Sequence, residues 1–309
     1  MSEEASDTDG RLATIVAATD FSPTAELALE RAKELAREHG ARVVLAHAIT
    51  LQPFAAGGPE LGTLPSDFEY QVREASVKRL ENLAEAIRGE GIDVETKVHS
   101  GLPAGMANSV AAEVDADLMV IGTRGLSGFK HLVLGSTAEE IIRHAPCPVL
   151  TVHPGDAHAL DRLAKVLVPT DFSEDALRAA REVTHLFRSQ AGSAHILLVH
   201  AGQLPPLVQP ILEELSFEPF TIEDLAASAR ERLEAEAERI RAAGFEVEVV
   251  VRVGDPAAVI TELVASEGVS LVAMGTRGHS GLKHLLLGST AERVVQHAAC
   301  PVLTVRREH

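Results

Sequence analysis

Short apolar runs alternate with longer amphipathic segments along the whole chain. Each run holds four to seven residues, mostly Val, Ile, Leu and Ala, and the segment after it has its apolar positions at helical spacing. Uninterrupted apolar strands that alternate with helices are typical of a parallel sheet with helices on both faces. The connections between such strands are expected to be right-handed.

The first half of the chain illustrates this alternation. We expect strands over Leu12–Ala18, Val43–Ile49, Val94–Val98, Leu118–Ile121 and Val149–Val152. We expect helices from Pro23 to about His39, and over Asp67–Arg88, Ala104–Val114 and Thr137–His144. Ser22 is a suitable N-cap, Pro suits a first helical turn, and Gly40 is a typical C-terminal stop.

The second half repeats the first, with its long helix expected over Thr221–Ala243. Residues 122–138 and 275–291 agree at 14 of 17 positions, at an offset of 153. Four shorter matches support the same duplication: His47-Ala48 with His200-Ala201, Gly101-x-Pro103-Ala104 with Gly254-x-Pro256-Ala257, Cys147–Val152 with Cys300–Val305, and Thr19–Ser22 with Thr170–Ser173. One long period present twice predicts two tandem domains. We place them at residues 1–153 and 165–309, with a linker over 154–164.

Composition narrows the classes of function. A length of 309 residues fits two domains. The net charge of -17 and an aromatic content of 3% disfavour nucleic acid as a partner. The acidic start does not resemble a signal peptide, and no apolar stretch reaches the roughly 18 residues of a membrane span. We therefore expect a cytoplasmic protein without membrane contact, and the scattered His and the two Cys predict no metal site built from protein ligands.

A glycine-rich loop follows the fourth strand of each half. Gly122-x-x-Gly125 is followed after nine residues by Gly135-Ser136, and Gly275-x-x-Gly278 by Gly288-Ser289. Glycine lets backbone N–H groups approach an anion, and a helix N-terminus favours a phosphate. Two alternatives stay open here: the glycines form a tight turn, or Ser136-x-x-Glu139 and Ser289-x-x-Glu292 are capping boxes with nothing bound.

On these residues the chain resembles the universal stress protein family in its tandem form. The G-x-x-G-x9-G-[ST] pattern is the mark of the family's ATP-binding branch, and both copies carry it. The Thr-Asp-Phe-Ser ends of the first strands, the Leu-x-His ends of the second strands and the closing Cys-Pro-Val-Leu-Thr-Val are similar too. The resemblance implies an α/β fold: two tandem Rossmann-like (adenine nucleotide alpha hydrolase-like) domains, each a five-stranded parallel sheet with helices on both faces.

The resemblance also implies one ATP site per domain, with Mg²⁺ held by the ATP phosphates. In the first domain the implied site residues are Ala18, Thr19, Asp20, Ala48, Gly122, Arg124, Gly125, Gly135, Ser136 and Thr137. In the second they are Pro169, Thr170, Asp171, Ala201, Gly275, Arg277, Gly278, Gly288, Ser289 and Thr290. The aspartates match the family position near the ribose, and a carboxylate can accept hydrogen bonds from ribose hydroxyls. Ala138 and Ala291 depart from the family, whose members often have a hydroxyl there.

No catalytic residue is expected. The sequence lacks the G-x4-G-K-[ST], G-x-S-x-G and H-E-x-x-H motifs, and no general base is positioned by spacing to activate water. The leading hypothesis is a nucleotide-dependent regulatory protein of the stress response. A slow Mg-dependent ATPase and a protein-interaction scaffold with vestigial sites are the alternatives. The resemblance further implies that the two domains pair through their closing strands as an intrachain pseudo-dimer, and it leaves a homodimer and unknown protein partners open.

Overall fold

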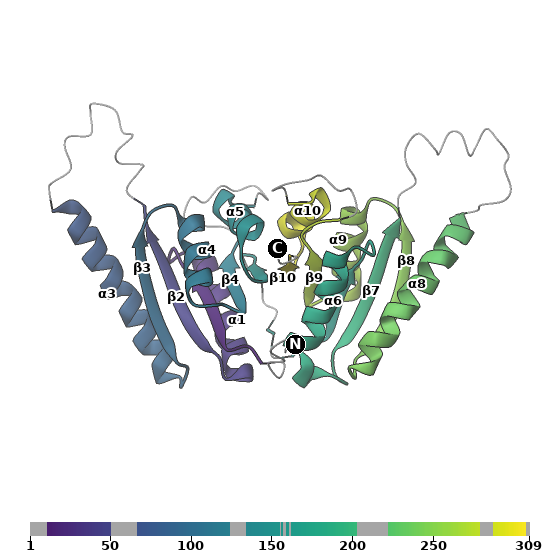
Figure 1. Cartoon of the computed structure of the whole chain (residues 1–309), viewed down its shortest axis with the longest axis horizontal. Helices are drawn as coiled ribbons and strands as arrows, with labels where there is room; N and C mark the ends of the chain where they lie inside the picture. Colours follow the sequence, from purple (N-terminus) through teal and green to yellow (C-terminus); the bar gives the residue numbers. More distant parts are fainter. Residues whose placement is uncertain are drawn as a thin grey trace, which may run out of the picture. The chain divides into compact units, whose positions relative to one another are not determined.

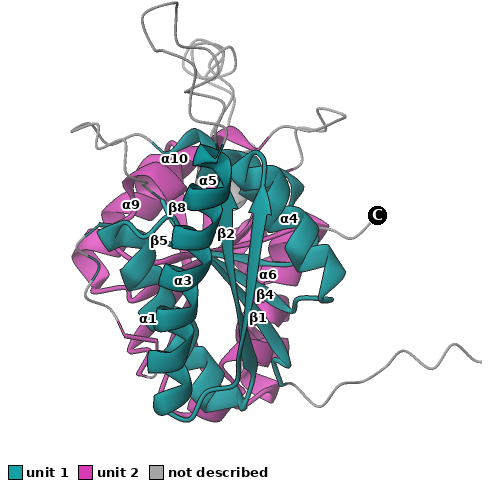
Figure 2. Ribbon diagram, turned by 90° about the vertical axis from the view of Figure 1, so that its left-hand side faces the viewer, with its two compact units in different colours: residues 1–156 teal, residues 157–309 magenta. Residues whose placement is uncertain are grey.

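A computed structural model describes residues 11–50, 67–123, 134–154, 156, 159–160, 162–202, 222–278 and 287–306, with the backbone alone at 222–225. The chain divides into two compact units, residues 1–156 and 157–309 (Figure 2). Each unit contains a parallel sheet with helices on both faces, so the predicted fold class is confirmed.

Unit 1 alternates strands with helices in the predicted order. Its strands are β1 (Thr14–Ala18), β2 (Arg42–Ile49), β3 (Val94–Ser100), β4 (Leu118–Gly122) and β5 (Val149–Val152). Its helices are α1 (Pro23–His39), α3 (Phe68–Gly89), α4 (Pro103–Glu113) and α5 (Ser136–His144). Each bound lies within two residues of the one predicted from the sequence.

The sheet of unit 1 has the strand order β3-β2-β1-β4-β5, with all neighbours parallel (Figure 1). The chain moves outward from β1 to β2 and β3, and then returns to β4 on the other side of β1. Because the crossovers are right-handed, α1 and α3 cover one face and α4 and α5 cover the other. The direction of winding thus changes between β1 and β4. Open parallel sheets bind ligands at such a point, outside the carboxyl ends of the strands.

Unit 2 repeats this topology. Its strands are β6 (Lys165–Pro169), β7 (His195–Gly202), β8 (Glu246–Val253), β9 (Leu271–Gly275) and β10 (Val302–Val305). Its helices are α6 (Glu174–Leu186), α8 (Ile222–Ala242), α9 (Pro256–Glu267) and α10 (Ser289–His297). The parallel order is β8-β7-β6-β9-β10, so the change of direction falls between β6 and β9.

Burial on both faces explains the continuous apolar strands. Ile15, Val16 and Val44 have no exposed surface in unit 1, and neither has Leu167 in unit 2. Side chains on a strand point alternately to opposite faces, so consecutive buried residues require helices on both sides. The core therefore lies along the central strands and holds their carboxyl ends in place.

Helix α1 shows how the sequence sets the ends of an element. Ser22 Oγ accepts a hydrogen bond from the N–H of Ala25 at 3.2 Å, and Pro23 is the first helical residue. The helix ends at Gly40, whose φ of 70° lies in the left-handed region and whose N–H donates to the carbonyl of Ala36. Both signals are visible in the sequence, and both predicted ends are confirmed.

A buried glutamine anchors the start of unit 2. Gln190 accepts a hydrogen bond from the N–H of Leu163 at 2.8 Å and donates one to the carbonyl of Leu160 at 2.7 Å. It lies in a short 3₁₀ helix, η1 (Arg188–Gln190), which the sequence analysis does not predict. Part of the segment assigned to the linker is therefore hydrogen-bonded to unit 2.

Candidate nucleotide site

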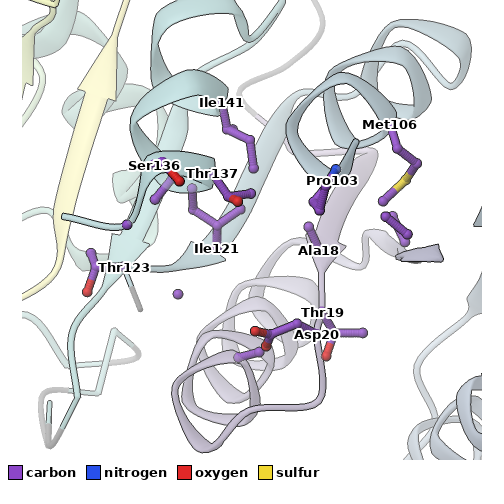
Figure 3. Close-up of a pocket in the computed structure, with 16 residues that line it drawn as sticks. Ala18, Thr19, Asp20, Pro103, Met106, Ile121, Thr123, Ser136, Thr137 and Ile141 are labelled. Carbon is purple, nitrogen blue, oxygen red and sulfur yellow. The ribbon is translucent and has the colours of Figure 1, made fainter. Parts of the chain in front are cut away.

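A cavity of about 260 Å³ lies at the carboxyl ends of β1 and β4 in unit 1, where the winding changes direction (Figure 3). Eight of the ten site residues predicted for the first domain line it. They are Ala18, Thr19, Asp20, Ala48, Gly122, Gly135, Ser136 and Thr137. The other two, Arg124 and Gly125, lie outside the described residues.

Unit 2 has a cavity of about 530 Å³ at the equivalent place, at the ends of β6 and β9. All ten site residues predicted for the second domain line it. They are Pro169, Thr170, Asp171, Ala201, Gly275, Arg277, Gly278, Gly288, Ser289 and Thr290. Residues that are far apart in the sequence are thus brought to one cavity in each unit.

Sequence reasoning missed the apolar wall of the cavity. Pro103 and Met106, from the start of α4, line it in unit 1, and Pro256 and Ile260 of α9 do so in unit 2 (Figure 3). The signal was available, because Gly-x-Pro-Ala occurs at the same place in both halves. This match marks the duplication, and it also marks the apolar wall, which no phosphate-binding motif indicates.

The turn after β1 carries the first polar group of the site. Asp20 Oδ1 accepts a hydrogen bond from the N–H of Ser22 at 3.0 Å, and Thr19 Oγ1 accepts one from the N–H of Phe21 at 3.0 Å. The carbonyl of Thr19 accepts a hydrogen bond of 2.8 Å from Nδ1 of His47 on β2. The local side-chain bonds and the histidine fix this turn beside the cavity.

Unit 2 repeats the same turn with the same bonds. Asp171 accepts from Ser173 at 3.0 Å, Thr170 accepts from Phe172 at 2.9 Å, and His200 bonds the Thr170 carbonyl at 2.8 Å. A histidine at the end of a buried strand is expected to be a hydrogen-bonded core residue without a ligand role. The histidines of both units are half-buried and hydrogen-bonded, which agrees with that expectation.

Phe21 and Phe172 have unusual backbones. Their φ angles are 61° and 65°, in the left-handed region that a bulky side chain rarely adopts. Such a conformation costs about 1–3 kcal/mol and persists where the surroundings hold it in place. The same strain at the same place in both units ties it to the turn that carries the aspartate.

Each of these phenylalanines contacts both a histidine and an arginine. The Phe21 and His47 ring centroids are 4.6 Å apart, and Arg79 Cζ lies 4.2 Å from the Phe21 centroid. In unit 2 the corresponding distances are 4.7 Å from Phe172 to His200 and 3.9 Å from Arg232 to Phe172. Arg79 belongs to α3 and Arg232 to α8. These arginines were not predicted as site residues, since no local motif marks them.

The opposite side of the cavity is a helix N-terminus. The N-cap of α5 is Gly135, which has no side chain to accept a hydrogen bond, and Ser136 is the first helical residue. Helix α10 begins in the same way, with Gly288 as N-cap and Ser289 next. The first N–H groups of a helix have no partner within it, so they and the helix dipole favour an anion here.

The capping-box alternative is wrong. It requires Ser136 at the N-cap, but the helix begins with that residue, so Glu139 lies one position too far along. Glu139 instead pairs with Arg143, and in unit 2 Glu292 accepts a hydrogen bond from Gln296 at 3.2 Å. The exposed hydroxyl of Ser136 is therefore available beside the cavity.

The first glycine of each loop has a packing role. A Cβ added to Gly122 would lie 3.0 Å from Cγ2 and 3.1 Å from the carbonyl carbon of Thr24, in the first turn of α1. A Cβ on Gly275 would lie 2.7 Å from Cβ of Asp175, in the first turn of α6. Close helix–strand contact explains these glycines without any ligand.

A charged group in unit 2 has no counterpart in unit 1. Burial and the nearby positive charge of Arg277 lower the pKa of Arg306, while the carboxylate of Asp175 acts in the opposite direction. At the offset of 153, Arg306 corresponds to His153, and the match of Thr170–Ser173 with Thr19–Ser22 aligns Asp175 with Thr24. The surroundings of the two cavities therefore differ in charge.

Among the residues that the structure describes, no group of three His, Cys, Asp or Glu is arranged to hold a metal ion. No helix in the described ranges is long and apolar enough to cross a bilayer.

The fold and the two cavities define a class of protein: tandem α/β domains, each with an uncapped helix N-terminus and a carboxylate on opposite sides of one cavity. The model of the universal stress protein family matches residues 12–153 and 163–306, so the chain belongs to the universal stress protein family.

Individual relatives agree with this assignment. A universal stress protein of Mycolicibacterium smegmatis is 29% identical over 300 residues, which cover 94% of this chain and 96% of the relative. One from Methanocaldococcus jannaschii is 34% identical over 140 residues, which cover 45% of this chain and 80% of the relative.

Solved structures share the whole two-domain fold. The crystal structure of a universal stress protein from Archaeoglobus fulgidus has a TM-score of 0.69 and 22% identity, and the match covers 96% of this chain and 97% of that one. A putative universal stress protein from Pseudomonas aeruginosa has a TM-score of 0.64 and 17% identity, covering 96% and 94%. At these identities the likeness concerns the fold.

Proposed function

We propose that each unit binds one ATP, with Mg²⁺ on its phosphates, and that the protein acts as a nucleotide-dependent regulator. The observation that carries the proposal is the same in both units. An uncapped helix N-terminus and a turn with an aspartate lie on opposite sides of one cavity. A nucleotide has an anionic phosphate chain at one end and a sugar with two hydroxyls further along, which matches this pair of groups.

Residue roles follow from this placement. The N–H groups and hydroxyls of Ser136 and Thr137 would bind the phosphates, and Asp20 would accept from the ribose. The apolar wall of Pro103 and Met106 offers a surface for the base. In unit 2 a Cβ on Gly278 would lie 2.5 Å from Oδ2 of Asp171, so the absence of a side chain keeps space open beside that carboxylate.

Nucleotide content is the first test. We would denature freshly purified protein, chromatograph what it releases, and titrate stripped protein calorimetrically with ATP and Mg²⁺. Two ATP per chain are expected. No released nucleotide and no heat at millimolar ATP would overturn the proposal and favour a scaffold with vestigial sites.

A charge placed at the helix start tests the site itself. In the double variant Ser136→Asp/Ser289→Asp, a carboxylate occupies the proposed phosphate position and repels the nucleotide. The same charge is favourable for the helix, by about 0.3–1 kcal/mol, so the fold is kept. Ser109→Asp/Ser266→Asp is the matched control, since these serines are exposed on α4 and α9 and do not line the cavities. Equal ATP affinity in both double variants would contradict the proposed site.

Turnover separates binding from hydrolysis. Incubation with ATP and Mg²⁺ followed by chromatography measures ADP, and a regulator that holds ATP produces little of it. Steady Mg-dependent release of ADP would favour the slow ATPase. Association through the closing strands, a homodimer and further protein partners stay predictions.

A further inference from the structure

The inference concerns the strained phenylalanine that follows each aspartate. A glycine would adopt a φ near 60° without strain, yet both halves have Phe at this position. A bulky residue in this conformation needs neighbours that hold its ring. Phe21 and Phe172 each have two such neighbours, a tilted histidine ring and an arginine guanidinium.

Each neighbour holds a different part of the turn. The His47 ring packs against Phe21, while its Nδ1 fixes the carbonyl of Thr19 at 2.8 Å. Arg79, on helix α3, places its guanidinium carbon over the Phe21 ring, 4.2 Å from the ring centroid. A cation over an aromatic face is attracted by the ring electrons. The residue between these fixed points is Asp20, which lines the cavity.

Arg79 is identical in the two halves although most of the helix before it differs. When residues 69–79 are aligned with 222–232 at the offset of 153, Arg79 and Arg232 are the one identical pair. Identical pairs are more frequent further along these helices, and they include the buried Leu80 with Leu233 and the exposed Glu85 with Glu238. Arg79 and Arg232 are exposed, so core packing does not explain them, whereas the contact with Phe does.

We propose that the Arg–Phe–His stack of each unit is a positioning device that aims the aspartate at the ribose hydroxyls of the bound nucleotide. The stacks are Arg79–Phe21–His47 and Arg232–Phe172–His200. They set selectivity for a ribonucleotide with free 2′ and 3′ hydroxyls. This inference rests on the proposed function, and it names arginines outside the cavity as residues that act through the aspartate.

The test compares ATP with 2′,3′-dideoxy-ATP, which lacks both hydroxyls. Wild-type protein is expected to prefer ATP by tenfold or more. In Arg79→Met/Arg232→Met the side-chain stem remains but the cation is lost, and we expect ATP affinity to fall about tenfold, the scale of one hydrogen bond to a charged group. Affinity for the dideoxy analogue should stay within about twofold, because that ligand makes no use of the aspartate.

Two further double variants complete the design. Arg73→Met/Arg230→Met removes the same charge from exposed positions of α3 and α8 and should behave as wild type. Arg79→Lys/Arg232→Lys keeps a cation near the ring and should restore at least half of the selectivity. If the Met variant does not fold, as judged by circular dichroism, Arg79→Gln/Arg232→Gln serves the same comparison.

The outcomes are distinguishable. If the Met variant loses equal affinity for ATP and for the dideoxy analogue, the stack has only a structural role. If the Met variant keeps the wild-type preference for ATP, the stack has no role in selectivity. Either result overturns the inference. Wild-type protein that binds both nucleotides equally overturns it as well and leaves the proposed ATP site intact. Wild-type protein that binds neither overturns both proposals.

Discussion

A Cβ atom on Gly275 would lie 2.7 Å from the Cβ of Asp175 and 2.8 Å from that residue's carbonyl carbon. Real Cβ atoms do not approach this closely, and the neighbours belong to the first turn of α6, so the helix must shift. We expect Gly275→Ala to destabilise the protein by about 1–3 kcal/mol, the usual cost of overpacking. Urea denaturation followed by circular dichroism measures this.

A second glycine serves as the control for that experiment. Gly105 is exposed inside α4, and a Cβ there would meet nothing within 4 Å. Alanine is the better helix former, so Gly105→Ala should raise stability by about 0.5–1 kcal/mol. Equal denaturation midpoints for both alanine variants would show that the contact with α6 has no cost.

Replacing either of two serines at helix starts by alanine should affect different properties of the protein. Ser22 caps α1 through its hydroxyl, so Ser22→Ala is expected to lower stability by about 1 kcal/mol. Ser136 does not cap α5, so Ser136→Ala should leave the melting temperature almost unchanged and weaken ATP binding in unit 1. Thermal melts and ATP titrations of the two variants check this contrast. A large stability loss in Ser136→Ala would contradict it.

The ion pair between Glu90 and Lys33 makes the folding stability depend on pH in the acidic range. Glu90 accepts a hydrogen bond from Lys33 at 2.9 Å, and this bond, with the charges of Lys33 and Arg37, lowers the pKa of Glu90 below 4.5. Because the folded state holds the charged form, this stabilisation is present above pH 4.5 and is lost as the pH falls through the lowered pKa. At neutral pH Glu90→Gln should cost about 0.2–1 kcal/mol, since the carboxylate is partly exposed.

The check is a series of denaturation midpoints from pH 7 down to pH 3. The difference between wild type and Glu90→Gln should shrink below pH 4.5. Glu85→Gln, at an exposed position of α3 five residues before Glu90, should match wild type throughout. A stability difference between wild type and Glu90→Gln that grows as the pH falls would contradict the predicted pH dependence.

The thiol of Cys147 should be unreactive toward alkylating reagents in the native protein. Burial, helped by the negative charge of Asp117, raises the pKa of the Cys147 thiol to about 12. The thiolate is the reactive form, so iodoacetamide at pH 8 should leave Cys147 unmodified in native protein and label it in urea. Peptide mass spectrometry reads out the modification. Rapid alkylation of the native protein would contradict this prediction and show that the Cys147 thiol is accessible and reactive.

The sequence predicts the fold well because burial on both sheet faces leaves long apolar runs such as those around Ile15 and Leu167. It also predicts which loops reach the cavity, since strand order brings the ends of β1 and β4 together. It does not predict contacts made by one exposed side chain across the chain, such as Arg79 on Phe21. The capping-box alternative failed because a shift of one residue in the helix start changes the role of Ser136.

The contact between Gly122 and the first turn of α1 affects how related sequences should be interpreted. A domain that had lost every trace of nucleotide binding would still favour glycine there, because a Cβ would crowd Thr24 at 3.0–3.1 Å. Presence of that first glycine is therefore a poor diagnostic of a working site. Ser136 and Thr137, which are exposed at the start of α5 and line the cavity, are the better basis for sorting binders from non-binders among relatives.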